Sequence, residues 1–193
     1  MHLYKNATSP YARLVTAAAT EWGLNSHIEI VDIDPWKERE KLTTVSPAAK
    51  VPALVTDDGT LIVESANICD YLAQLAGGGA PGVGNVDYFH RLGLARAAMD
   101  CAFGAFLQRR EARGADTALA TRWLQAIESI ARALDPSAKA RLAAERPDLA
   151  DLTATAAYHY VDFRLAEVPW RAAAPEFAAL VDRLAARPAF HAT

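Results

Sequence analysis

Residues 50–65 of this 193-residue chain read KVPALVTDDGTLIVES, and they predict a β-hairpin followed by the start of a helix. Two apolar runs, 53–56 and 61–63, flank the turn sequence DDGT. Asp-Gly between apolar runs is a strong hairpin signal, because tight hairpin turns need residues that tolerate positive φ. Ser65 then follows as the predicted N-cap of a helix that extends to Leu75.

Upstream of the hairpin, the pattern alternates between strands and helices. A short strand at 3–4 precedes a helix over 10–22, since Pro10 suits the first helical position, where its missing N–H is not needed. Residues 27–33 alternate as a second strand, and residues 36–42 predict a short surface helix. The predicted order is therefore β-α-β-α-β-β-α.

The composition of the chain changes at a glycine-rich stretch. Valine and isoleucine together number 11 in residues 1–76 but 5 in residues 87–193, whereas alanine rises from 11 to 30. β-Branched residues favour strands and alanine favours helices. We therefore predict a mixed α/β domain over 1–76, a linker over 77–86 and an all-helical bundle over 87–193. The helices expected in this bundle cover 87–113, 117–134, 148–167 and 175–186.

Charge and cysteine content exclude several classes of protein. The chain carries 20 basic and 23 acidic residues, which gives no electrostatic footprint for nucleic acid. It has no apolar run long enough for a membrane span and no signal-peptide pattern at its start, so we predict a cytoplasmic protein without a membrane partner. Two cysteines, Cys69 and Cys101, and five histidines without ligand spacing predict neither a disulfide framework nor a metal site.

Three segments remain that could carry chemistry. The first is TSPYAR at 8–13, where Ser9 lies at the start of a predicted helix. A helix N-terminus offers unpaired N–H groups and a partial positive charge, so the Ser9 hydroxyl could donate to a thiolate or another anion there. Serine is equally a preferred helix cap, so this position alone also fits a structural role.

The other two segments surround the hairpin. A cis Val51–Pro52 bond would turn the backbone N–H and C=O of Val51 outward, ready to pair with an extended peptide, although trans is the commoner isomer. Glu64 and Ser65 offer a carboxylate, a hydroxyl and free N–H groups, which suit the head group of an amino acid. The same pair also fits a helix cap preceded by a solvated acid.

Two acids in the second domain have a structural interpretation. Asp148 can cap the helix that follows it, and Asp151 stands at the third helical position. This is a capping-box arrangement with acids in both places.

In this order and spacing, the segments resemble the cytosolic glutathione S-transferases, and the similarity covers nearly the whole chain. The motifs that carry it are TSPYAR at 8–13, SPAAKVPAL at 46–54, DDG at 57–59, ES at 64–65, ICDYL at 68–72 and DLADL at 148–152. The resemblance implies a thioredoxin-like first domain and a helical second domain. It is nearest to small bacterial, serine-type members with a Thr-Ser-Pro-aromatic start.

The resemblance also implies glutathione as co-substrate, without a metal. Ser9 falls where serine-type members keep the hydroxyl that stabilises the glutathione thiolate. Lys50 would face the glycine carboxylate, and the backbone of Val51 would pair with the cysteinyl part of glutathione. Pro52 would be the family's cis proline.

Glu64 and Ser65 would hold the γ-glutamyl end of glutathione by the same resemblance. Members of the family form homodimers, and Asp100 would reach the γ-glutamyl amine bound by the partner subunit. The electrophile pocket would lie beside Tyr11, with Tyr88 and Arg91 as further wall residues.

The predicted function is glutathione transfer to small electrophiles in a detoxification role. Two alternatives stay open: a non-catalytic interaction or ligand-binding module with the same fold, and a glutathione-dependent peroxidase-type activity. Because position 9 holds serine where thiol-transfer members carry a nucleophilic cysteine, a disulfide-reducing role is less favoured.

Overall fold

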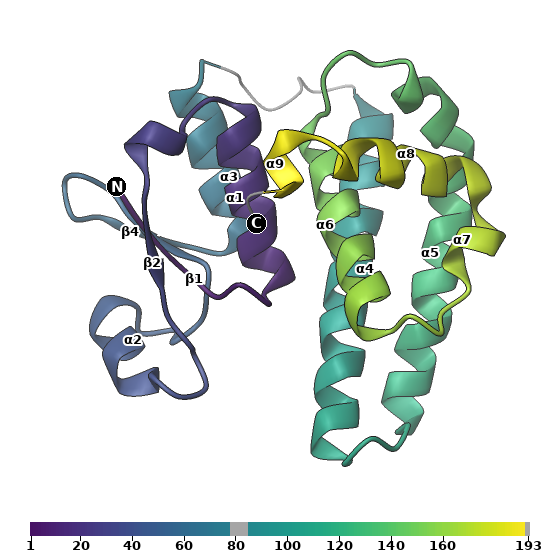
Figure 1. The fold of residues 1–193 in the computed structure, drawn as a ribbon, viewed down its shortest axis with the longest axis horizontal. Coiled ribbons are helices and arrows are strands. Elements are labelled where there is room, and N and C mark those ends of the chain that lie inside the picture. The colour runs from purple at the N-terminus through teal and green to yellow at the C-terminus, as the bar shows by residue number, and fades with distance from the viewer. Residues whose placement is uncertain (78–84, 192–193) are drawn as a thin grey trace. The chain divides into compact units, whose positions relative to one another are not determined.

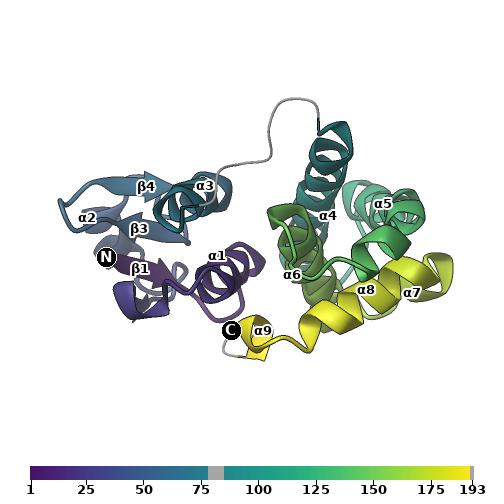
Figure 2. The same ribbon diagram turned by 90° about the horizontal axis from the view of Figure 1, so that it is seen from above.

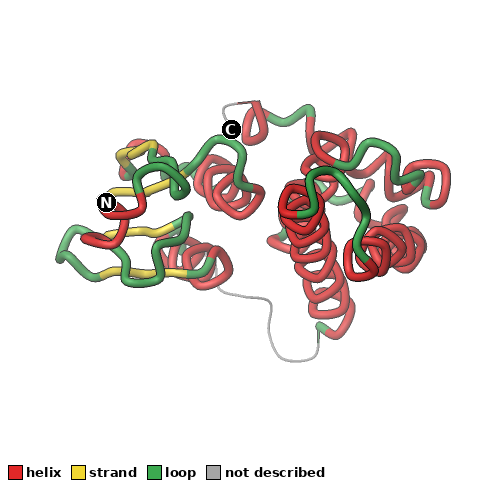
Figure 3. Tube along the Cα trace, turned by 90° about the horizontal axis from the view of Figure 1, so that it is seen from below, coloured by secondary structure: helices red, strands yellow, loops and turns green. Residues whose placement is uncertain are grey.

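The computed structural model describes residues 1–77 and 85–191. The chain forms two compact units, residues 1–82 with 188–193 and residues 83–187. Figure 3 shows the strands in the first unit and a bundle of helices in the second. The predicted linker over 77–86 falls largely on residues outside the described part of the chain, so its boundaries stay a prediction.

The first unit is built on a four-stranded sheet with the strand order β2-β1-β3-β4. β1 (His2–Lys5) pairs in parallel with β2 (Glu29–Asp32) and antiparallel with β3 (Ala53–Val55). β4 (Leu61–Val63) pairs antiparallel with β3 and completes the predicted hairpin. The predicted βαβαββα order of a thioredoxin-like domain is confirmed.

Two helices, α1 (Pro10–Glu21) and α3 (Ser65–Leu75), run side by side in this unit (Figures 1 and 2). Both carry an apolar face toward the core, as the helical spacing of their apolar residues requires. The core side chains Leu3 and Leu54, which are paired across the sheet, are fully buried.

The surface helix α2 (Arg39–Val45) begins three residues later than the predicted 36–42. The reason is a turn at Asp34, whose carboxylate accepts a hydrogen bond from the N–H of Trp36 at 2.9 Å. The carbonyl of Asp34 also accepts from the N–H groups of Lys37 and Glu38. Aspartate often stabilises such a turn, and here the turn delays the helix. A short 3₁₀ helix, η1 (Asn25–His27), follows α1.

The second unit consists of helices. They are α4 (Val86–Glu111), α5 (Ala118–Leu142), α6 (Leu149–Arg164), α7 (Trp170–Ala173) and α8 (Pro175–Ala185). α6 packs against both α4 and α8, and its residues from Leu149 to Tyr158 are all buried. Around Tyr158, the rings of Trp170 and Phe177 lie 4.6 and 4.9 Å away between centroids. No helix in the described part of the chain is long and apolar enough to cross a membrane.

α5 continues through Pro136 to Leu142, so the predicted end at residue 134 is wrong. Contacts with α8 explain the extension. The carboxylate of Asp135 on α5 accepts from the N–H of Phe177 at 2.9 Å, near the start of α8. Arg183 on α8 donates in return to the carbonyl groups of Leu142, the last residue of α5, and of Ala144 just beyond it. Each helix therefore satisfies free backbone groups at an end of the other.

The final helix, α9 (Pro188–His191), packs on α1 and belongs to the first unit. Arg13 of α1 donates to the carbonyl of Phe190 at 3.1 Å, and its guanidinium lies 5.9 Å from the centre of the Phe190 ring. The sequence analysis assigned this segment to the helical domain. Four residues are too short to show a helical period, so the contact with α1 could not be predicted.

Gly104 on α4 lies against the Trp123 ring on α5, which leaves no room for a side chain at this position. A Cβ atom at this position would lie 2.7 Å from the Trp123 ring. We expect Gly104→Ala to lower the free energy of unfolding by about 1–3 kcal/mol, because the ring must shift in a packed interface. Urea unfolding measures this loss.

Gly93 on the same helix provides the matched control, since a Cβ there meets nothing within 4 Å. Gly93→Ala should raise stability by up to about 1 kcal/mol through helix propensity. Equal effects of the two substitutions would contradict the proposed clash.

Candidate functional site

Ser9 is the N-cap of α1, with its backbone in the extended region. Its hydroxyl oxygen accepts a hydrogen bond from the N–H of Ala12 at 3.2 Å. Pro10 occupies the first helical position, as predicted. Because the Ser9 oxygen accepts this bond through a lone pair, the hydroxyl hydrogen stays available to an anion at the start of the helix.

The neighbouring hydroxyl of Thr8, unlike that of Ser9, already donates its proton within the loop. Its O–H donates to the side-chain oxygen of Asn6 at 2.7 Å, and the Thr8 N–H donates to the same oxygen at 3.0 Å. The N–H of Ser9 donates to the Asn6 carbonyl at 3.1 Å. Asn6 therefore orders the loop that precedes α1 and engages the Thr8 proton. The sequence analysis missed Asn6, although asparagine commonly bonds the backbone two residues later.

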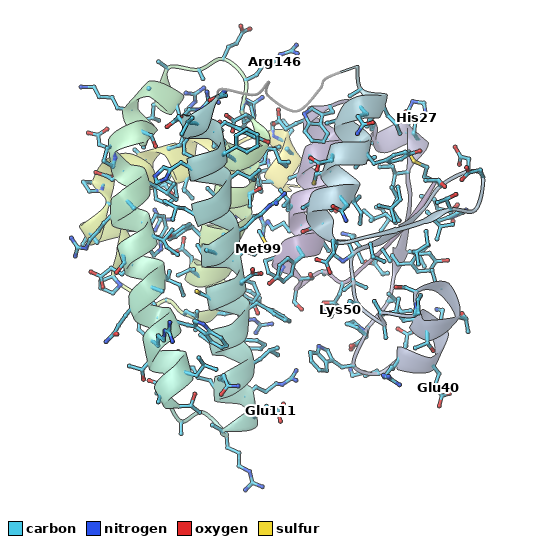
Figure 4. All side chains as sticks on the ribbon, turned by 180° about the vertical axis from the view of Figure 1, so that it is seen from behind. His27, Glu40, Lys50, Met99, Glu111 and Arg146 are labelled. Atoms are coloured by element: carbon cyan, nitrogen blue, oxygen red, sulfur yellow. The ribbon has the colours of Figure 1, made fainter. Side chains whose placement is uncertain are left out.

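The second segment forms a loop between α2 and β3. The Val51–Pro52 bond is cis, as the resemblance implies, and Pro52 is buried. Val51 is half-buried, and its backbone N–H and C=O make no backbone hydrogen bond within the described residues. Lys50 is exposed on the same loop, where Figure 4 labels it. The loop therefore offers an unpaired stretch of backbone beside one cation.

Glu64, between β4 and α3, has a φ of 68°. Non-glycine residues rarely adopt a positive φ, and such positions gather at functional sites. The predicted capping role of Ser65 is wrong: Glu64 is the N-cap residue and makes no side-chain capping bond, while Ser65 is the first helical residue. The exposed Glu64 carboxylate and the largely buried Ser65 thus lie at a helix N-terminus whose N–H groups lack a side-chain cap.

The strand register brings these three segments to one end of the sheet. Tyr4 near the end of β1 pairs with Ala53 at the start of β3, and Ala53 pairs with Val63 at the end of β4. The loop to Ser9, the Val51 backbone and Glu64 each continue from that end. The Ser9 hydroxyl, the unpaired backbone of Val51 and the Glu64 carboxylate therefore belong to segments that adjoin neighbouring strands at this end of the sheet. Tyr11 is half-buried in the first turn of α1.

The remaining predicted residues lie on α4 in the other unit. Asp100 is exposed, whereas Tyr88 is only 3% exposed. Arg91 is also buried, and its guanidinium bonds to Asp87 at 2.8 Å, Asp148 at 2.6 Å and Asp151 at 2.9 Å. Because three carboxylates bind the Arg91 guanidinium, this side chain does not line an electrophile pocket as predicted. Burial likewise argues against Tyr88 as a wall residue.

Two of the three acids that bind Arg91, Asp148 and Asp151, form the predicted capping box of α6, which is confirmed. Asp148 accepts from the N–H of Asp151 at 3.0 Å, and Asp151 accepts from the N–H of Asp148 at 3.0 Å. Arg141 adds a second cation on Asp151. Burial opposes ionisation, but hydrogen bonds from Arg91 and the backbone hold the pKa of Asp148 below its ordinary value. This cluster is a structural centre of the helical unit.

Comparison with known proteins finds similarity to glutathione S-transferases. Residues 8–75 match the family described as glutathione S-transferase, N-terminal domain. The GST-like protein YibF of Escherichia coli K12 is 27% identical over 203 residues, which cover 100% of this chain and 98% of that protein. Glutathione S-transferase 2 of Saccharomyces cerevisiae is 34% identical over 80 residues, 40% of this chain and 34% of that protein.

Solved structures agree over the full length. A glutathione transferase family member from Pseudomonas fluorescens Pf-5, crystallised with bound glutathione, has a TM-score of 0.86 at 27% identity and covers 100% of this chain and 97% of that one. The same protein was crystallised with S-(propanoic acid)-glutathione, at a TM-score of 0.83. The family match over residues 8–75, the full-length relative and the fold all agree with the predicted resemblance to the glutathione S-transferases.

Proposed function

We propose that the first unit binds glutathione and activates its thiol for attack on small electrophiles. The observation that carries the proposal is the convergence of Ser9, Val51 and Glu64 at one end of the sheet, with the Ser9 proton available. Glutathione bound to the Pseudomonas neighbour supports it.

Each part of glutathione finds a chemical counterpart in this arrangement. The unpaired N–H and C=O of Val51 match the backbone of the cysteinyl residue, and Lys50 matches the glycine carboxylate. The Glu64 carboxylate matches the ammonium of the γ-glutamyl end. Ser65 and the N-terminus of α3 match the carboxylate beside that ammonium.

The reaction then depends on the thiol. A free thiol has a pKa of about 8.5 and is mostly protonated at neutral pH. The Ser9 hydroxyl and the N-terminus of α1 favour the charged form, so they raise the thiolate fraction. The thiolate sulfur donates an electron pair to the electrophilic carbon, the S–C bond forms, and either a leaving group departs with its pair or an activated double bond accepts the pair and then a proton. Ser9 donates a hydrogen bond and takes no proton.

We also propose that the chain works as a homodimer, in which Asp100, exposed on α4, contacts the γ-glutamyl amine bound by the partner subunit. Asp100 supports this only through its exposure on α4. Sedimentation of wild type and Asp100→Ala, with glutathione titration of each, tests the assignment.

Calorimetric titration of glutathione into the protein tests the binding proposal. We expect saturable binding that weakens about 10- to 100-fold in Glu64→Gln, because a charge-assisted hydrogen bond contributes about 1.5–3 kcal/mol. Glutamine keeps the size of the side chain and removes its charge. Glu40→Ala, an exposed acid on α2, is the control and should bind as wild type does.

The outcomes separate the candidate functions. No binding at millimolar glutathione would reject the transferase proposal. Saturable binding without turnover of any electrophile would instead support the non-catalytic ligand-binding module.

A further inference from the structure

One asparagine connects the end of the first strand to the start of the candidate thiol site. Asn6 directly follows β1 and is half-buried. Its side-chain oxygen accepts hydrogen bonds from the Thr8 hydroxyl at 2.7 Å and from the Thr8 N–H at 3.0 Å. Its carbonyl accepts from the Ser9 N–H at 3.1 Å. Asn6 therefore accepts three hydrogen bonds from the two residues that precede α1.

The backbone on both sides of this turn is held by regular structure. On the strand side, the carbonyl of Lys5 accepts from the N–H of Ile33 at 2.9 Å, which fixes the end of β1. On the helix side, the Ser9 carbonyl accepts from the N–H of Arg13 at 3.0 Å. The position of Ser9 relative to the sheet therefore depends on the turn that joins the two.

The turn itself depends on its hydrogen bonds, because it is open to water. Ala7 and Thr8 are both exposed, so packing contributes little to their conformation. An asparagine side chain that accepts from the N–H two residues later forms an Asx turn, which imitates a backbone turn. The Asx turn and the backbone bond to Ser9 close the same four residues. Without the Asn6 side chain, the backbone bond is the one of these three that remains.

We propose that Asn6 is a positioning residue for the thiol chemistry: its side chain holds the Ser9 hydroxyl where a bound thiolate can receive its hydrogen bond. This inference rests on the proposed function, in which Ser9 donates to the thiolate of glutathione. A hydrogen bond weakens steeply when its angle departs from linearity, so a looser turn would stabilise the thiolate less. Asn6 touches no substrate in this proposal and acts only through Ser9.

An ultraviolet titration of the protein–glutathione complex from pH 5.5 to 9.5 tests the proposal, because a thiolate absorbs where a thiol does not. The measurement needs no electrophile. We expect Asn6→Ala to raise the midpoint of the bound thiol, by less than Ser9→Ala does. Below the midpoint, the thiolate fraction should fall about 2- to 10-fold, as the loss of one ordinary hydrogen bond predicts. Calorimetry on the acidic side of the midpoint should give a glutathione affinity close to that of wild type.

Asn25 offers a matched control in the same unit. It is an exposed asparagine in η1, and its side-chain oxygen also accepts from a threonine hydroxyl, that of Thr20, at 3.1 Å. It precedes β2, which runs parallel to β1, so it lies at the opposite end of the sheet from the turn after β1. Asn25→Ala should leave the midpoint unchanged. Asn6→Ser keeps an oxygen that can accept in the same turn more weakly, so its midpoint should lie between those of wild type and Asn6→Ala.

The double variant Asn6→Ala/Ser9→Ala shows whether Asn6 acts through Ser9. If it does, the double variant has the midpoint of Ser9→Ala, because the hydroxyl that Asn6 positions is already absent. Midpoint shifts that add would overturn the proposal, and so would a wild-type midpoint in Asn6→Ala. Should Asn6→Ala fail to fold, Asn6→Ser decides the question, since its midpoint must still lie above that of wild type.

The same series separates this inference from the proposed function. If Ser9→Ala leaves the midpoint unchanged, the thiolate contact of Ser9 is wrong, and the role of Asn6 fails with it. If Ser9→Ala raises the midpoint and Asn6→Ala does not, the thiolate contact stands and only the role of Asn6 is rejected.

Discussion

Ser9→Ala should lower kcat/KM for conjugation about 10- to 100-fold near pH 6.5 while leaving glutathione affinity within about threefold of wild type. The reason is the loss of one hydrogen bond to a charged sulfur, worth about 1.5–3 kcal/mol. The hydroxyl favours the thiolate over the neutral thiol, so its removal raises the pKa of the bound thiol.

The upward shift in the pKa of the bound thiol determines how the rate loss depends on pH. Below the pKa of the bound thiol, wild type holds more thiolate than the variant, and the rate loss is largest there. Above the raised pKa, both proteins hold thiolate and their rates approach each other. A profile of kcat/KM from pH 5.5 to 9.5 measures this, with the variant's midpoint shifted upward.

Thr8→Val is the matched control, because the Thr8 proton is already donated to Asn6. It should leave both the rate at pH 6.5 and the midpoint close to wild type. A larger effect of Thr8→Val than of Ser9→Ala would assign the thiolate contact to Thr8 instead.

Arg91→Ala should lower the free energy of unfolding of the helical unit by about 3–5 kcal/mol, because it removes the buried cation that bridges Asp148 and Asp151. The Arg91 side chain is 7% exposed and that of Asp151 is 3% exposed, so water cannot replace the lost pairing. Urea unfolding followed by circular dichroism measures the loss.

Arg109→Ala provides the comparison. Arg109 also bridges two acids, Asp116 and Glu167, but both carboxylates are about half exposed. Exposed ion pairs contribute at most about 1 kcal/mol. If the two variants lost the same stability, burial of the Arg91 cluster would not govern its contribution.

The elements that the sequence predicted well are those with strong local signals. Pro10 marked the start of α1, the DDGT turn marked the hairpin, and Asp148 with Asp151 marked the capping box. In each case the residues that set the conformation are neighbours in the chain. Local chemistry then suffices for the prediction.

The predictions that were wrong concern features that residues distant in the chain determine. The sequence analysis ended the helix at residue 134, but contacts with α8, 42 residues later, extend it to Leu142. Arg91 was predicted as a wall residue of the electrophile pocket, but its partners Asp148 and Asp151 are 57 and 60 residues away in the chain. Spacing along one helix could not reveal either contact.

The candidate site shows both cases. Ser9, Val51 and Glu64 were identified from motifs, and the strand register then brought their segments to one end of the sheet. The sequence could not show that the Thr8 hydroxyl proton is donated within the loop whereas the Ser9 proton is not, because this depends on which acceptor lies near each hydroxyl. Asn6 supplies that acceptor for Thr8 alone.

The position of α9 has a consequence for the order in which the protein can be completed during synthesis. Arg13 and the carbonyl of Phe190 are separated by 177 positions in the chain. A ribosome therefore delivers every strand of the first unit and all of the helical bundle before α1 can meet its last partner. Domains fold as units from the N-terminus while the chain emerges. The first unit must therefore hold its sheet with this face of α1 uncovered until residues 188–191 have been synthesised, and a fragment cut after residue 187 would remain in that nascent state.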